Sequence, residues 1–78
     1  MWKPINDCGK QLTVHSRVRE KPGNGYKVYD IATVEFDQYH LQLVSENDQP
    51  PAEEQRQVLN CSQLVQYRFE VEMKDRYL

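Results

Sequence analysis

Long apolar stretches are missing from this sequence, and their absence limits where the chain can reside. No run approaches the roughly 18 consecutive apolar residues that a membrane-spanning helix requires. Residues 1–4 also lack the apolar core of a secretory signal peptide. We therefore expect a cytoplasmic protein that does not associate with membranes.

Glycine is also scarce, with three residues in the chain. Gly23 and Gly25 flank Asn24, which is typical of a hairpin turn, and no helix start follows that would make this a phosphate-binding loop. The sequence therefore contains no nucleotide-binding motif of that kind.

The two cysteines, Cys8 and Cys61, form no C-x2-C pair, and with His15 and His40 they lack the spacing of a zinc site. They could pair in an oxidising compartment, but in a cytosolic chain we expect independent thiols packed as small apolar groups. No motif orients a histidine toward Cys61 as a base toward a nucleophile. We expect no metal, no cofactor and no enzymatic activity.

The chain is short and polar, and its charge is unevenly distributed. Its 78 residues form one domain, with 38% hydrophobic and 28% charged residues, so the core must be small and we expect a monomer or a weak homo-oligomer. Residues 1–29 carry six basic and two acidic groups, a net charge of +4. Residues 30–78 carry four basic and ten acidic groups, a net charge of −6, which favours a basic partner surface.

Alternating apolar and polar residues predict an all-β fold. We expect five strands in a meander that closes into a small barrel, with a brief helical turn near Ser62. The strands are predicted at residues 11–19, 26–36, 39–43, 58–59 and 64–73, with an irregular lead-in at 1–10, a polar loop at 45–57 and a tail at 74–78.

The long second strand carries apolar residues on both faces, so we expect it to bend, with Asp30 as the site of the bend. Asp37 and Gln38 are predicted to turn the chain into the next strand. Phe36 and Tyr39, on either side of this turn, are predicted to close onto the core.

This order of strands, turns and one helical turn resembles the SH3-like and Sm-like small barrels. The segment "VYDIATVEFDQYHLQLVSEN" is similar to the first Sm motif, in which a strand runs into an aspartate-containing turn followed by an aromatic residue. Asp37 and Tyr39 occupy these places. His40 and Gln42 stand where the family has its base-reading asparagine, so RNA binding does not carry over from the resemblance.

Two further departures concern the bent strand and the second Sm motif. The family's glycine in the bent strand is absent, and residues 59–62 replace the second motif. Pro4, Ile5 and Asn6, with Cys8 nearby, resemble the Rof-type proteins, acidic Sm-like bacterial inhibitors of the transcription terminator Rho.

We expect a non-catalytic binding module, a regulatory or accessory factor of bacterial or phage origin whose protein partner has a basic surface. An amino-terminal tryptophan that stays exposed would mark an interface. An acidic surface formed by the hairpin and the polar loop, together with the polar residues of the predicted turn, would face the partner. The predicted partner-binding residues are Trp2, Glu35, Asp37, Gln38, His40, Glu53 and Glu54.

The alternative is single-stranded RNA or DNA binding by the basic first strand. Cations of that strand and its turn would contact phosphates, and a tyrosine would stack on a base. The residues concerned are Arg17, Arg19, Lys21, Lys27 and Tyr29. The acidic second part of the chain opposes phosphate binding.

Overall fold

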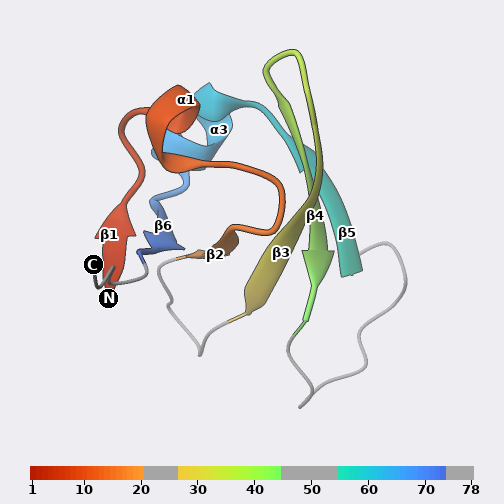
Figure 1. The fold of residues 1–78 in the computed structure, drawn as a ribbon, viewed down its shortest axis with the longest axis horizontal. Helices are drawn as coiled ribbons and strands as arrows, with labels where there is room; N and C mark the ends of the chain where they lie inside the picture. The colour runs from red at the N-terminus through yellow and green to blue at the C-terminus, as the bar shows by residue number, and fades with distance from the viewer. Residues whose placement is uncertain (21–26, 45–54, 74–78) are drawn as a thin grey trace, which may run out of the picture.

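The structure is a computed structural model that describes residues 1–20, 27–44 and 55–73 (Figure 1). Strands dominate it, which confirms the all-β class. In chain order the elements are β1 (Trp2–Pro4), α1 (Cys8–Gln11), β2 (Arg17–Glu20), β3 (Val28–Glu35), β4 (Gln38–Leu43), β5 (Arg56–Leu59), α3 (Cys61–Gln66) and β6 (Phe69–Glu72).

The strands form one antiparallel sheet in the order β1-β6-β2-β3-β4-β5. It has six strands where five were predicted, and over the described residues it is open, with β1 and β5 at its two edges. None of the helices in residues 1–20, 27–44 and 55–73 has the length and hydropathy needed to cross a bilayer.

The prediction of an irregular lead-in at 1–10 is wrong, because this segment contains β1 and most of α1. β1 pairs with β6, a contact between segments too distant for local patterning to reveal. The Asp7 side chain accepts a hydrogen bond from the Lys10 N–H at 3.3 Å and caps α1. The turn-forming residues are therefore used to start a helix.

The first strand was predicted from residue 11, but β2 begins at Arg17. Residues 13–16 form a turn in which the Thr13 N–H donates to Ser16 Oγ at 3.0 Å and the Ser16 N–H donates to the Thr13 carbonyl at 3.0 Å. His15 adopts a φ of 75°, outside the strand region. The alternation from residue 11 is therefore partly coincidental, and the strand begins only at Arg17.

Strand β3 contains one residue more than β4 opposite it. Ile31 lies opposite Leu41, whereas Thr33 lies opposite His40, so Ala32 forms a β-bulge. The prediction placed a bend at Asp30, whereas the irregularity that the structure shows is this bulge at Ala32.

The bulge changes which side chains share a face. Tyr29 and Ile31 face the core, with 3% and 0% of their surface exposed. After the extra residue Val34 lies opposite Tyr39, so it points to the same side of the sheet. An unbroken alternation would have placed Val34 on the other face from Ile31.

The hairpin between β3 and β4 is present, but its turn lies one residue earlier than predicted. Glu35 pairs with Gln38, and the two residues between them are Phe36 and Asp37. Tyr39 is buried as expected. The prediction that Phe36 closes onto the core is wrong, because the turn places its side chain in solvent.

The carboxyl-terminal part differs from the prediction in its boundaries. Of the polar loop predicted at 45–57, residues 45–54 lie outside the described residues, and Arg56 and Gln57 already belong to β5. Leu64, predicted in the last strand, lies in α3, which begins with a capping box between Asn60 and Gln63. The tail at 74–78 lies outside the described residues.

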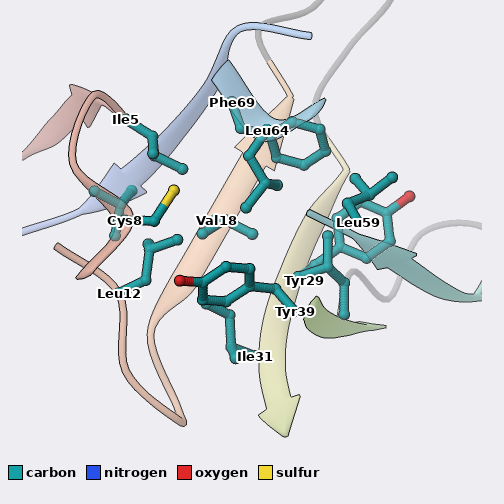
Figure 2. Close-up of a cluster of buried hydrophobic side chains, with 12 residues drawn as sticks. Ile5, Cys8, Leu12, Val18, Tyr29, Ile31, Tyr39, Leu59, Leu64 and Phe69 are labelled. Atoms are coloured by element: carbon teal, nitrogen blue, oxygen red, sulfur yellow. The ribbon is translucent and has the colours of Figure 1, made fainter. Parts of the chain in front are cut away.

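The core is made by side chains of the sheet and of both helices (Figure 2). The helices contribute Cys8 and Leu64, and Ile5 and Leu12 flank α1. The strands contribute Val18, Tyr29, Ile31, Tyr39, Leu41, Leu59, Phe69 and Val71.

A disulfide joins Cys8 to Cys61, so the expectation of independent thiols is wrong. The two cysteines are the first residues of α1 and α3, which lie side by side (Figure 1). Their Cα atoms are 6.0 Å apart despite a separation of 53 residues along the chain. Spacing in the sequence could not show this proximity, because it arises from the fold.

Candidate partner-binding site at the β3–β4 hairpin

The turn that joins β3 to β4 is fixed to the body of the protein. Asp37 adopts a φ of 51°, a left-handed conformation that aspartate tolerates better than most residues. Its Oδ1 accepts a hydrogen bond from the backbone N–H of Cys61 at 3.2 Å. The turn is therefore held against the first residue of α3, which the disulfide links to α1.

Phe36 is the most exposed large hydrophobic residue of the described chain, with 98% of its surface accessible. An exposed phenyl ring gains nothing from folding, and its burial in a partner would remove a large apolar area from water. We use the name "tip" for residues 35–38, which comprise this ring and the polar residues Glu35, Asp37 and Gln38 around it.

Acidic residues precede and follow Phe36 in the sequence of the tip. The Glu35 side chain is largely exposed, and its Oε1 lies 2.9 Å from Nε2 of His40. That nitrogen is shielded from water, and its contact with Glu35 does not have the geometry of a hydrogen bond. His40 thus orients Glu35 at the base of the tip.

Four of the predicted partner-binding residues are brought together on this hairpin: Glu35, Asp37, Gln38 and His40. Glu53 and Glu54 lie outside the described residues. Trp2 lies on the edge strand β1, separated from β3 by β6 and β2. The structure therefore gathers the hairpin residues but places the tryptophan elsewhere.

Trp2 has its own partners on the outer face of the sheet. The guanidinium carbon of Arg19 lies 4.3 Å from the centre of the indole ring. Arg19 Nε donates to Glu70 Oε1 at 2.9 Å, and both side chains are less than one-fifth exposed. These three residues form a packed cluster that joins β1, β2 and β6, which is a structural role.

The basic residues of the alternative hypothesis do not form the expected stripe. Arg17 and Lys27 are exposed, whereas Arg19 belongs to the Trp2 cluster. Tyr29 is buried, its ring centre 6.5 Å from that of Phe69, and its hydroxyl accepts a hydrogen bond from Gln57 Nε2 at 3.0 Å. It cannot stack on a base in this conformation. Lys21 lies outside the described residues.

Sequence reasoning missed the most exposed side chain of the site. The pattern assigned Phe36 to the core because it follows Val34 at the strand period. The useful signal was its place directly before Asp37, since a residue within a two-residue turn leaves the alternation of the strand.

Comparison of the chain with protein-family models, with curated proteins and with solved structures finds no match. Over the residues that the structure describes, no three side chains of histidine, cysteine, aspartate or glutamate are grouped as metal ligands. A functional assignment therefore has to come from the chemistry of the exposed surface.

Proposed function

We propose that this protein is a non-catalytic protein-binding module, a regulatory or accessory factor that inserts Phe36 into an apolar pocket of a partner whose pocket rim is basic. The observation that carries the proposal is the 98% exposure of Phe36 between two carboxylates. Buried aromatic anchors dominate the affinity of many interfaces, while charges around them raise the association rate.

The order of the elements supports an SH3-like or Sm-like relationship. β2, β3, β4 and β5 follow one another in the sheet, and α3 stands between β5 and β6, as in the resemblance drawn from the sequence. β1 adds a sixth strand beside β6. Barrels of this type are binding modules of many kinds, so the fold agrees with the proposal without selecting a partner.

A cytoplasmic location and a monomeric or weakly associating state remain predictions. The disulfide favours an oxidising compartment, because cytosolic reductants keep most thiols reduced. Alkylation of free thiols in intact host cells, before and after reduction, reports which state Cys8 and Cys61 have there.

The test is affinity capture from the host with wild-type and Phe36→Ala protein as baits. We expect a partner that wild type retains and the variant loses by about tenfold or more, and that dissociates faster at high salt. Tyr67→Ala is the matched control, because Tyr67 is an exposed aromatic residue at the end of α3. A partner retained equally by all three baits would contradict the proposal.

A further inference from the structure

A second candidate site lies between the segment at residues 10–17 and the end of β6. It is a cavity of about 370 Å³, near the lower end of the roughly 300–1,000 Å³ range of small-ligand sites. Seven residues of the segment at 10–17 line it, together with Glu72 and Met73. None of its lining residues belongs to the tip, so the cavity and the tip can be tested separately.

The charges that line this cavity are mainly positive. Lys10 and Arg17 contribute two cations, and Glu72 contributes one carboxylate. Among the described residues, neither cation has a carboxylate within ion-pair distance. An oxyanion in the cavity would therefore be their first strong ionic partner within this part of the chain.

The wall formed by residues 10–17 is held in place at both ends. Gln11 Oε1 accepts hydrogen bonds from the backbone N–H groups of Asn6 and Asp7, both at 2.8 Å. At the other end, the His15 N–H donates to the Ile31 carbonyl at 2.8 Å, and the Ile31 N–H donates to the Ser16 carbonyl at 2.9 Å. Fixed walls reduce the entropy lost on binding a ligand.

His15 lies on this wall in a backbone conformation that few side chains adopt. Its φ is 75°, and 83% of its side chain is exposed. Its Nδ1 is 3.7 Å from Asp30 Oδ2, within ion-pair distance of that carboxylate, so Nε2 is the ring nitrogen that a ligand can contact. Strained backbone of this kind occurs preferentially at functional sites.

We propose that this cavity binds a phosphate group, held by Lys10 and Arg17 with His15 as a further donor. Arginine pairs with two phosphate oxygens through its planar guanidinium, and lysine acts as a point charge. The exposed Val14 and Met73 offer an apolar surface beside the cations, which fits a phosphorylated organic molecule or a nucleic-acid end.

The test is a titration of ¹⁵N-labelled full-length protein followed by NMR, with inorganic phosphate, a mononucleotide and a short single-stranded oligonucleotide as separate probes. We expect the amide chemical shifts of residues 10–17 and 72–73 to change and to saturate as the probe is added. The affinity obtained from these shifts should fall as the salt concentration rises. Equal affinity for mononucleotide and oligonucleotide indicates a small ligand, and tighter oligonucleotide binding with a steeper salt dependence indicates nucleic acid.

Lys10→Gln combined with Arg17→Gln should weaken the tightest of these probes by about tenfold or more, since both phosphate contacts are lost. Lys3→Gln is the control, because Lys3 is an exposed lysine on β1 that does not line the cavity. The amide spectrum of each variant reports whether it is folded. Shifts that do not saturate with any probe, or an equal loss for Lys3→Gln, would overturn the assignment.

Discussion

The two halves of β3 have opposite environments, although both carry apolar residues. Before the bulge, Tyr29 and Ile31 are buried in the core, whereas after it Val34 is 40% exposed, and Phe36, in the turn that follows β3, is almost fully exposed. Val34 and Tyr39 face the same side of the sheet, but Tyr39 is buried and Val34 is 40% exposed. Strand alternation therefore assigns a side chain to a face, and a second layer must lie over that face before the side chain is buried.

The comparison assigns stability to the first half of β3, and it places the proposed partner contact in the hairpin beyond the bulge. The tip can carry an exposed aromatic residue because the first half already anchors the strand in the core. Substitutions on either side of Ala32 test this division directly.

The largest effect is expected for Ile31→Ala. Removing a fully buried isoleucine should lower the free energy of unfolding by about 2–5 kcal/mol, through lost apolar burial and a residual cavity. Denaturant unfolding monitored by circular dichroism measures it. Val34→Ala, beyond the bulge, should cost less than about 1 kcal/mol. Equal losses for the two variants would remove the distinction between the halves.

Removing the disulfide should have the next largest effect. Cys8→Ser combined with Cys61→Ser should lower stability by about 2–4 kcal/mol, because the crosslink closes a long loop in the unfolded chain. The same unfolding assay with and without a dithiol reductant checks the result. The reductant should destabilise wild type by a similar amount and leave the double variant unchanged.

A smaller effect is expected at Asp37, which holds the tip against α3. Asp37→Ala should cost about 1 kcal/mol, since the Cys61 N–H loses its acceptor and alanine tolerates a positive φ poorly. Asp37→Asn keeps an acceptor and a residue type that adopts this conformation, so it should be close to wild type in thermal unfolding. Identical behaviour of the two variants would show that the hydrogen bond does not stabilise the tip.

The smallest effect on stability is expected at Phe36, where the effect on binding is largest. Phe36→Ala should leave the unfolding midpoint unchanged, because the ring is already in water in the folded protein. Calorimetry alongside the capture experiment measures both properties. A marked loss of stability would mean that Phe36 packs against the protein in solution.

The sequence predicted the centre of the chain better than its beginning and end. The hairpin of β3 and β4 and the helical turn at α3 were predicted because each depends on residues close together along the chain. β1 was missed because it has three residues and owes its existence to β6. The start of the last strand was misplaced because the capping pair Asn60 and Gln63 was not recognised as a helix signal.

The candidate sites were predictable in part for the same reason. The hairpin residues are neighbours in sequence, so their grouping around Asp37 could be expected. The cavity forms where residues 10–17 lie next to the end of β6. These segments are far apart in the sequence, so no local sequence pattern predicts their contact. The burial of Tyr29 and the pairing of Arg19 with Glu70 likewise depend on contacts between distant segments.

The contact between Trp2 and Arg19 also provides an optical probe. Trp2 is the single tryptophan of the chain, so intrinsic fluorescence excited at the red edge of indole absorption reports the β1 edge alone. Circular dichroism averages over the whole sheet. If the edge frays before the core melts, the fluorescence transition will precede the dichroic one, and the interval between them measures how independently β1 opens.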